Sequence, residues 1–346
     1  MTIFLFTLVI VTVLSSKFNL VGFYDDYISK DSIEPIKGIF LVFVFLTHFA
    51  QYIPLDGAMH TFYALVRKKH GQLIVTPFLF YSGYGVFESI KKKGSAYVRT
   101  MPVNRCLKLL MDFDIAIFIY YILSVFDNKN YPIKKILLSF IGWDSLRNSN
   151  WYIFVILGMY IISFLAFYGF DYETQKEYIV TTIVIMTIVF SYFISLHKET
   201  YWYNTIWCYV AGGIYSVYKN EIEKNILSNN KSYFISFFNI ILLFICFYSR
   251  WYQKVSYYQL ASVAFSLIIV FISIKIKVTN KFLNYCGRHL FSLYILQRLP
   301  MIFFQNTVLS ENVYVYFVAC AVITVLISAI FDRFTAMLWK SATKVK

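Results

Sequence analysis

The chain has 346 residues, of which 59% are hydrophobic, 21% are aromatic and only 14% are charged, and its mean hydropathy is +0.61. This composition excludes an ordinary soluble globular domain and indicates a protein embedded in lipid. The formal net charge of +14 is too scattered along the chain to indicate nucleic-acid binding.

Apolar runs of roughly 15 to 21 residues alternate with short polar stretches, as expected for helices that cross a hydrocarbon layer about 30 Å thick. We therefore expect an all-α integral membrane protein with about eleven transmembrane helices in a single membrane domain over residues 1–346. The expected spans lie near residues 2–16, 38–54, 72–90, 106–126, 151–170, 178–196, 204–218, 233–249, 258–275, 289–304 and 313–332. The first run is short, but it lacks a basic leader and a small-residue cleavage site, so we expect it to be retained.

Lysine and arginine are unevenly divided between the two sets of connections. If the N-terminus lies outside, the inner connections and the basic tail over 336–346 hold about 20 of these residues, and the outer connections hold about half as many. The positive-inside rule therefore predicts an N-out, C-in topology. No internal repeat is visible, which disfavours a transporter built from inverted repeats.

The five cysteines lie in or beside the expected spans and form no C-x-x-C pair. They predict neither a disulfide framework nor a zinc site, and we expect no metal. We interpret all five as small apolar packing residues. They are Cys106, Cys208, Cys246, Cys286 and Cys320.

A titratable residue inside a membrane span is costly, so the few in this chain are candidate functional residues. His48 follows Lys37 by eleven residues, which returns a helix to within roughly 20° of the same face and raises it about 16 Å. We expect Lys37 at the inner surface and His48 near the middle of the membrane. A neutral imidazole there can act as a general base. The alternative is a histidine that hydrogen-bonds across helices for packing.

A second cluster runs from the basic segment 91–99 into the fourth expected span as Arg105, Lys108 and Asp112. The i, i+3, i+7 spacing predicts that these three residues share one helix face, where Asp112 can pair with Lys108. Arg and Lys at this depth suit an anionic ligand such as a phosphate. The alternative is a set of basic residues that flank a span because topology requires them.

Three further segments contain small or polar residues at expected spans. Phe80-Tyr81-Ser82-Gly83-Tyr84-Gly85 permits close backbone approach, and close helix packing is the simplest interpretation. Asn150, Trp151 and Tyr152 open the fifth expected span, where an aromatic belt explains the two rings. Arg298 in the tenth span requires an internal partner, which the sequence does not identify.

Five segments together resemble, in order and spacing, the membrane acyltransferase family called acyltransferase 3, over roughly residues 30–335. They are Ile36-Lys37-Gly38-Ile39 with His48, Phe80-Tyr81-Ser82-Gly83-Tyr84, Arg105-x-x-Lys108, Asn150-Trp151-Tyr152 and Cys286-Gly287-Arg288-His289-Leu290-Phe291-Ser292-Leu293-Tyr294-Ile295-Leu296-Gln297. The resemblance implies a ten-helix acyltransferase core that modifies extracytoplasmic glycans with a cytoplasmic acyl-coenzyme A. Residues 1–29 would then add one N-terminal span.

The resemblance also implies roles for single residues, with His48 as the catalytic residue and a basic element near the inner surface as the acyl-coenzyme A site. The expected donor-binding residues are Lys37, Arg105, Lys108, Ser82 and Tyr84. The expected acceptor-binding residues are Asn150, Trp151, Tyr152 and Arg298. Asp112 is the candidate orienting partner of His48.

The chain departs from the family pattern at three positions. Lys37 and Lys108 stand where arginine is the commoner residue, and the loss of a forked donor at Lys108 alters the phosphate geometry. Gln297 ends a segment that in many members ends in histidine, so no proton transfer is expected at this position.

We therefore expect an O-acetyltransferase in a bacterial plasma membrane that moves an acetyl group from cytoplasmic acetyl-CoA to a hydroxyl of a surface polysaccharide or its lipid-linked repeat unit. His48 would deprotonate the hydroxyl or carry the acyl group itself. Membrane lipid is the other expected partner, nucleic acid is not, and a homo-oligomer is left open. One alternative is a transporter or flippase for polyprenyl-linked glycans, with His48, Asp112 and Arg298 in its pathway. Another is a non-catalytic membrane subunit.

Overall fold

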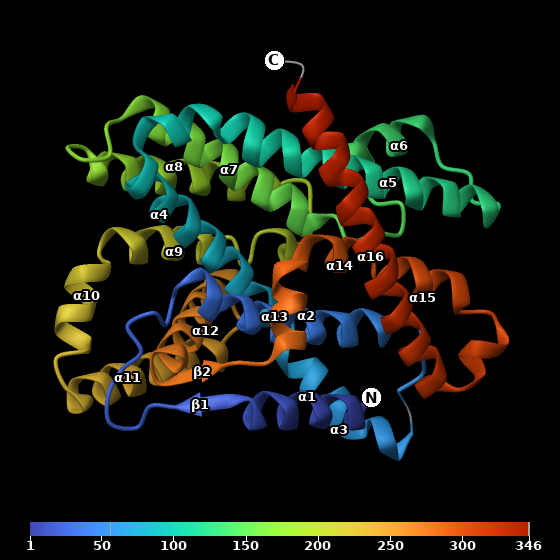
Figure 1. Cartoon of the computed structure of the whole chain (residues 1–346), viewed down its shortest axis with the longest axis horizontal. Helices are drawn as coiled ribbons and strands as arrows, with labels where there is room; N and C mark the ends of the chain where they lie inside the picture. The colour runs from blue at the N-terminus through green and yellow to red at the C-terminus, as the bar shows by residue number, and fades with distance from the viewer. Residues whose placement is uncertain (56, 345–346) are drawn as a thin grey trace.

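The computed structural model describes residues 1–55 and 57–344, so the last two residues of the expected basic tail over 336–346 lie outside the described residues (Figure 1). Its elements are α1 (Thr2–Leu14), β1 (Ser16–Phe18), α2 (Lys30–Phe49), α3 (Ala58–His70), η1 (Leu73–Val75), α4 (Thr76–Met101), η2 (Pro102–Leu107), α5 (Lys108–Phe126), α6 (Ile133–Phe140), α7 (Trp151–Gly169), α8 (Lys176–Ser195), η3 (Thr200–Trp202), α9 (Trp207–Val217), α10 (Lys219–Ile226), α11 (Asn230–Tyr248), α12 (Val255–Lys275), β2 (Ile276–Val278), α13 (Lys281–Arg288), α14 (Leu290–Leu296), α15 (Arg298–Phe304), η4 (Val308–Glu311) and α16 (Val313–Lys344).

Within the described part of the chain, seven helical runs are long and apolar enough to cross a membrane. They are Lys30–Phe49, Leu73–Phe126, Trp151–Gly169, Lys176–Ser195, Asn230–Tyr248, Val255–Lys275 and Val313–Thr343. The predicted helical, multi-pass architecture is therefore confirmed. Every expected span contains helix, but eleven crossings and the N-out topology stay predictions, because α1, α9, α14 and α15 have only 13, 11, 7 and 7 residues.

One short ribbon accompanies the helices. β1 pairs antiparallel with β2, with Ser16 opposite Val278, and so ties the end of α1 to the end of α12. Strands of three residues are too short to show an alternating pattern in the sequence, and they were not expected.

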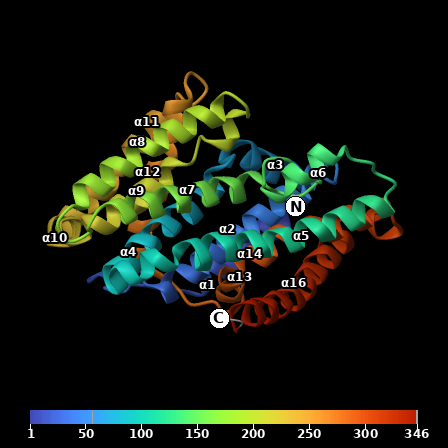
Figure 2. The same cartoon turned by 90° about the horizontal axis from the view of Figure 1, so that it is seen from above.

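Helix α2 begins at Lys30 and not near residue 38 as predicted, because Ser29 caps it by accepting a hydrogen bond from the Ser32 N–H. Figures 1 and 2 show α2 in the middle of the bundle, with the long α16 crossing one outer side. His48 is consequently the penultimate residue of α2. The expectation that His48 lies near the middle of the membrane stays a prediction, because the position of a residue along a helix does not give its depth in the membrane.

The 54-residue run that contains α4 and α5 is interrupted twice. Gly94 has a φ of +59°, a conformation that glycine adopts at little cost, and it kinks α4. The turn over Pro102–Leu107 then has π-helical hydrogen bonding. A π turn winds less per residue than an α turn, so residues three apart diverge on the helix surface.

Glycines allow two helix pairs to cross with their backbones in contact. A Cβ built on Gly38 of α2 would lie 1.9 Å from the Leu283 carbonyl oxygen of α13, and one on Gly287 of α13 would lie 1.9 Å from the Glu34 oxygen of α2. The α4–α9 crossing repeats the arrangement, since a Cβ on Gly83 would lie 2.0 Å from the Tyr209 oxygen. The close-packing interpretation of the Phe80–Gly85 segment is thus confirmed.

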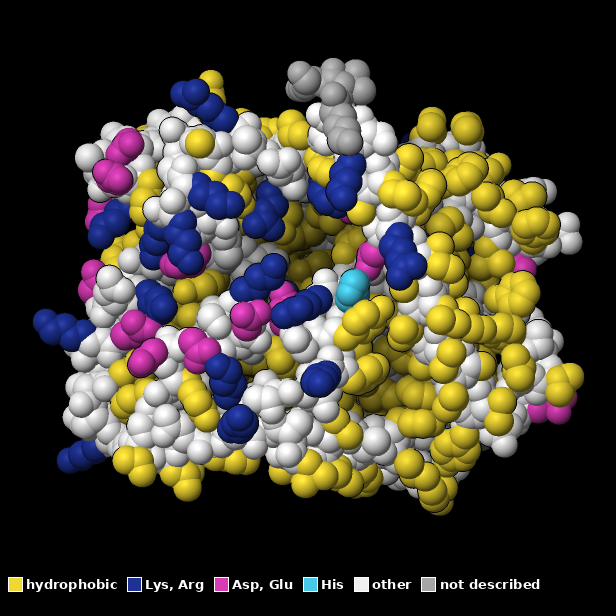
Figure 3. Space-filling view, in the orientation of Figure 1, with side chains coloured by type: hydrophobic (Ala, Val, Ile, Leu, Met, Phe, Trp, Pro, Cys, Tyr) yellow, Lys and Arg dark blue, Asp and Glu magenta, His cyan; other side chains and the backbone are white. Residues whose placement is uncertain are grey.

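Charge is unevenly spread over the surface. On the face in Figure 3, lysine and arginine gather over the half that contains α4, α10 and the ribbon. Hydrophobic side chains dominate the half over α15 and the start of α16. Asp and Glu lie among these cations, so on this face the charged side chains of both signs are concentrated in one half.

Candidate functional site

His48 lies in a cavity of about 400 Å³, which we call the histidine cavity. The walls come from the end of α2, the loops that precede η1 and α7, and the α14–α15 junction. His48 lines it from α2 and Gln51 from the turn that follows α2. Ser149 lines it from the loop before α7, Trp151 from the start of α7 and Arg298 from α15. With Gln72 and Tyr201, polar groups from five separate segments of the sequence therefore converge on this cavity.

Ser149 links the imidazole to a guanidinium. The Ser149 Oγ lies 3.5 Å from His48 Nε2 and accepts a 2.9 Å hydrogen bond from Arg298 Nε. Arg298 also donates to the Gln51 Oε1 at 2.8 Å and to the Tyr52 hydroxyl at 3.3 Å. The predicted internal partner of Arg298 is thus a set of neutral oxygens. Arg298 reaches His48 through a hydroxyl and keeps a full positive charge beside the cavity.

The loop before α7 is held rigidly. The Asn150 side chain donates to the Gly142 and Asp144 carbonyl oxygens at 2.8 and 2.9 Å. Gly142 has a φ of +74°, which the loop needs and which glycine supplies at little cost. These bonds commit the Asn150 amide to the loop, so Asn150 fixes the position of Ser149.

Sequence reasoning missed several lining residues, namely Gln51, Gln72, Ser145, Asn148, Ser149 and Tyr201. Two signals could have found some of them. Four of the six residues in Ser145–Asn150 are small and polar immediately before an apolar span. Gln51 stands three residues after His48 and so shares its helix face.

A second cavity, of about 560 Å³, lies at the other end of α2, and we call it the basic cavity. Its five cations come from four separate parts of the chain: Lys30 and Lys37, Lys92, Arg105, and Lys219. Four carboxylate residues line it as well, so the cations exceed them by one: Asp25, Asp26, Glu34 and Glu88. Lys37 faces this cavity and His48 faces the other, in line with the predicted shared face. One stripe of α2 thus connects the basic cavity to the histidine cavity.

Arg105 and Lys37 have different surroundings. The Arg105 Nε donates to the Tyr97 hydroxyl at 2.8 Å, and its guanidinium lies 5.8 Å from the centre of the Tyr160 ring. No carboxylate pairs with Arg105 among the described residues. Lys37 pairs with buried Glu34 at 2.9 Å. Arg105 therefore has donor capacity left for an anionic ligand.

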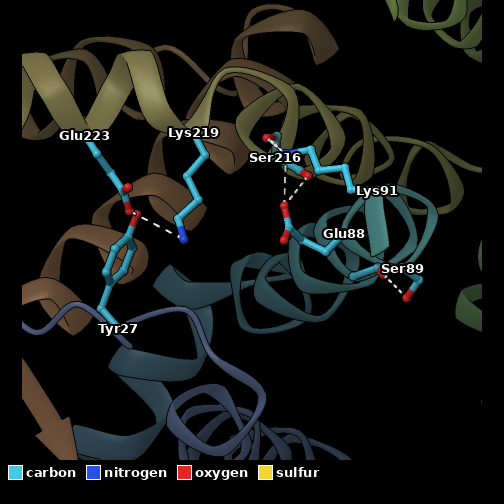
Figure 4. Close-up of polar contacts among 8 residues, drawn as sticks. Tyr27, Glu88, Ser89, Lys91, Ser216, Lys219 and Glu223 are labelled. Carbon is cyan, nitrogen blue, oxygen red and sulfur yellow. Dashed lines mark hydrogen bonds and ion pairs between the residues drawn. The ribbon is translucent and has the colours of Figure 1, made fainter. Parts of the chain in front are cut away.

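Polar contacts fix the rim of the basic cavity (Figure 4). Glu88 of α4 accepts a 2.7 Å bond from Ser216 of α9 and pairs with Lys91 at 3.0 Å. Tyr27 donates to Glu223 at 2.9 Å, and Glu223 pairs with Lys219 at 3.5 Å. Burial raises the pKa of the Tyr27 hydroxyl, so it remains a donor. The segment before α2 is thereby tied to α10.

Lys108 and Asp112 pair as predicted, at 2.9 Å, but neither lines the basic or the histidine cavity. The Lys108 ammonium lies 5.8 Å from the Trp339 ring of α16, whereas Arg105 faces Tyr97 and Tyr160. The prediction that Arg105 shares a face with these two residues is therefore wrong, because the π turn over Pro102–Leu107 precedes Lys108. Asp112 is accordingly not placed to orient His48.

The remaining expected residues lie between or beside the two cavities. Tyr84 lines the basic cavity, whereas Ser82 does not and instead approaches the hydroxyl of half-buried Tyr152. The Tyr152 ring packs 5.8 Å from the Tyr294 ring, which itself lies 6.2 Å from the His48 ring. Tyr152 therefore supports the wall of the histidine cavity and does not line it.

No group of three or more His, Cys, Asp or Glu side chains that could hold a metal ion occurs among the described residues. The fold and the two cavities define a multi-pass membrane protein with a histidine site and a basic site at opposite ends of one central helix. This layout suits an enzyme that receives a charged donor at one end and a polar acceptor at the other.

Comparison with known proteins gives the family. Residues 30–333 match the acyltransferase domain of the acyltransferase 3 family, which is well over half of the chain. The protein belongs to this family and is a membrane enzyme that transfers acyl groups, for which the family suggests an acyl-CoA donor. No curated protein and no solved structure matches the chain significantly.

Proposed function

We propose that this protein is an O-acetyltransferase that moves an acetyl group from cytoplasmic acetyl-CoA to a hydroxyl of a surface polysaccharide or its lipid-linked repeat unit. The observation that carries the proposal is that one stripe of α2 presents Lys37 to a basic cavity and His48 to a separate polar cavity. Eleven residues of helix separate the two side chains by about 16 Å.

In this proposal the basic cavity holds the phosphates of the donor. Arg105 supplies forked hydrogen bonds, and Lys30 of α2 and Lys92 of α4 supply further positive charge. The two cavities share no lining residue among those described, and the Tyr152–Tyr294 packing belongs to the wall of the histidine cavity. The pantetheine arm must therefore displace side chains to bring its thioester to His48.

His48 acts on the acceptor. The imidazole removes the proton of a sugar hydroxyl, the oxygen attacks the thioester carbonyl carbon, and the carbon–sulfur bond breaks to release CoA, whose sulfur takes the proton. Alternatively the imidazole first takes the acetyl group and then passes it to the hydroxyl. On either route, Arg298 provides positive charge where the carbonyl oxygen becomes negative.

The acceptor enters from the outer side of a bacterial plasma membrane. Asn150 and Trp151 line the histidine cavity together with several neutral oxygens and amides, a set suited to sugar hydroxyls. A transporter pathway through His48, Asp112 and Arg298 is disfavoured, since Asp112 does not line the cavity that holds the other two.

The test uses cells in which the gene is deleted and then restored as wild type or as His48→Ala. NMR of the surface polysaccharides should show an O-acetyl resonance that is lost on deletion, returns with the wild type and stays absent with His48→Ala.

The matched control is His60→Ala, which removes an imidazole that lines neither the histidine cavity nor the basic cavity, and it should restore acetylation. Full acetylation by correctly inserted His48→Ala protein would refute the role of His48. Unchanged acetylation on deletion would refute the function.

A further inference from the structure

The histidine cavity continues into a third cavity, which is separate from the basic cavity. This side cavity has a volume of about 420 Å³ and shares Gly71, Gln72 and Tyr201 with the histidine cavity. A ligand bound at His48 can therefore extend past these three residues without leaving the protein surface.

The side cavity is lined by aromatic rings. Tyr248, Trp251, Tyr252 and Tyr258 form its walls together with Tyr201. Faces of aromatic rings offer apolar area to the C–H faces of sugars, while the tyrosine and indole polar groups can hydrogen-bond. The lining thus suits a carbohydrate.

Two buried side-chain oxygens in the side cavity have no hydrogen-bond partner among the described residues, namely Gln72 Oε1 and Asn204 Oδ1. Buried polar atoms of this kind are normally satisfied, and leaving one unpaired costs free energy. Rotation of these two side chains toward the cavity would let a ligand with hydroxyl donors pair them. The loop that holds Gln72 is itself fixed, since its N–H donates to the Tyr258 hydroxyl at 2.9 Å.

The charge of the side cavity is positive. Lys68, Lys69 and Lys254 line it, no carboxylate residue does, and none of the three lysines forms an ion pair within the described part of the chain. A neighbouring cavity beside Trp143 is different, because its Lys198 already pairs with Asp144 at 3.7 Å and donates to the Trp143 carbonyl at 2.6 Å. That cavity also holds Lys135, but two carboxylates, Asp144 and Glu199, line it as well, so of these two cavities only the side cavity has cations without a carboxylate.

We propose that the side cavity binds a negatively charged sugar of the acceptor, so that the acceptor is an acidic glycan, which lies across the side cavity and presents a neighbouring sugar to His48. This proposal rests on the proposed acetyltransferase function and names its substrate class. Carboxylate or phosphate groups on the glycan pair with Lys68, Lys69 and Lys254, and the ring faces stack on Trp251 and Tyr252.

In the first test, the glycan that loses its O-acetyl resonance when the gene is deleted is identified. This glycan is then applied to an anion-exchange column. Retention of the glycan at low salt is the expected result. A neutral glycan that flows through would overturn the inference while leaving the acetyltransferase function intact. If no glycan loses acetyl groups, the function itself fails and the inference fails with it.

The second test uses the unacetylated glycan from the deletion strain as the acceptor for purified protein in phosphatidylcholine vesicles opened by detergent. For Lys69→Gln/Lys254→Gln we expect a KM for the glycan roughly three- to tenfold above that of the wild type, with unchanged kcat. The matched control, Lys129→Gln/Lys134→Gln, removes two exposed lysines that line no part of the side cavity, and it should keep the wild-type KM.

Equal KM values for the two double variants would overturn the proposal. Adding the anionic lipid phosphatidylglycerol to the vesicles distinguishes binding of a lipid headgroup from binding of the glycan. If the KM difference appears only with this anionic lipid, the side cavity holds a lipid headgroup, and the glycan assignment is refuted.

Discussion

Single residues set the chemistry of the histidine cavity, and Ser149 holds the central place among them. It stands between His48 and Arg298, with its oxygen 2.9 Å from the Arg298 Nε and 3.5 Å from the His48 Nε2. Because no carboxylate lines this cavity among the described residues, the orientation of the imidazole depends on this hydroxyl. Ser149 is therefore a positioning residue.

Replacing Ser149 by alanine should lower kcat for acetyl transfer roughly 10- to 100-fold, because a small displacement of a catalytic group is costly. The KM for acetyl-CoA should not change, since the basic cavity is separate. The measurement is steady-state transfer of labelled acetyl groups by purified protein. Ser149→Thr keeps the hydroxyl and should recover most of kcat, and a Thr variant as slow as Ala would count against a positioning role.

Arg105 should govern donor binding. Arg105→Met removes a half-buried guanidinium that has no carboxylate partner among the described residues. We expect the KM for acetyl-CoA to rise roughly 10- to 100-fold, because the loss of a hydrogen bond to a charged group weakens binding by about this factor. Arg99→Met is the matched control, since Arg99 is exposed and lines no part of the basic cavity. Equal KM values in both variants would place the phosphates elsewhere.

Residues on one helix were predictable, and residues that meet through folding were not. Lys37 and His48 share a stripe of α2 because helical periodicity fixes it. Ser149 and Gln72 both line the histidine cavity, but they come from segments far apart in the sequence, and no spacing rule connects them. Lys108 was misplaced relative to Arg105 because a π turn is not visible in the sequence.

At the scale of elements, glycine contacts determine how closely the helices pack around the site. Gly38 and Gly287 bring α2 and α13 into backbone contact, which fixes the position of the helix that carries Lys37 and His48. The sequence signalled close approach only at Phe80–Gly85, and even there it did not say which helix would be the partner. The partner helix is known only once the chain has folded.

The Gly38→Ala substitution should be strongly destabilising. Its Cβ would lie 1.9 Å from the Leu283 carbonyl oxygen, so α2 and α13 must separate, at a cost of about 1–3 kcal/mol or more. Thermal unfolding in detergent measures the effect. Gly85→Ala is the matched control, because a Cβ there meets nothing within 4 Å and alanine favours helix by up to about 1 kcal/mol. A Gly38→Ala protein as stable as Gly85→Ala would show that the crossing is looser than described.

At the scale of the whole molecule, the folded chain brings together cations that the sequence only assigned to one side. Lys30, Lys37, Lys92, Arg105 and Lys219 line one cavity, and the charge count independently placed their connections on the inner side of the membrane. Counting charges can divide connections between two sides, but it cannot show that four of these segments converge on one cavity. That convergence depends on the packing of α2, α4 and α9.

The N-out, C-in topology can be tested by labelling intact cells with a membrane-impermeant maleimide, in a background from which the five native cysteines have been removed. Lys129→Cys should be labelled from outside, whereas Lys92→Cys and Ser341→Cys should react only after the cells are opened. The physical reason is that about 20 lysine and arginine residues fall in the connections expected inside, and such residues are retained on the cytoplasmic side. Labelling of Lys92→Cys in intact cells would place the basic cavity outside, where cytoplasmic acetyl-CoA cannot reach it. The assignment of that cavity to the donor would then fail, even though membership of the acyltransferase family would stand.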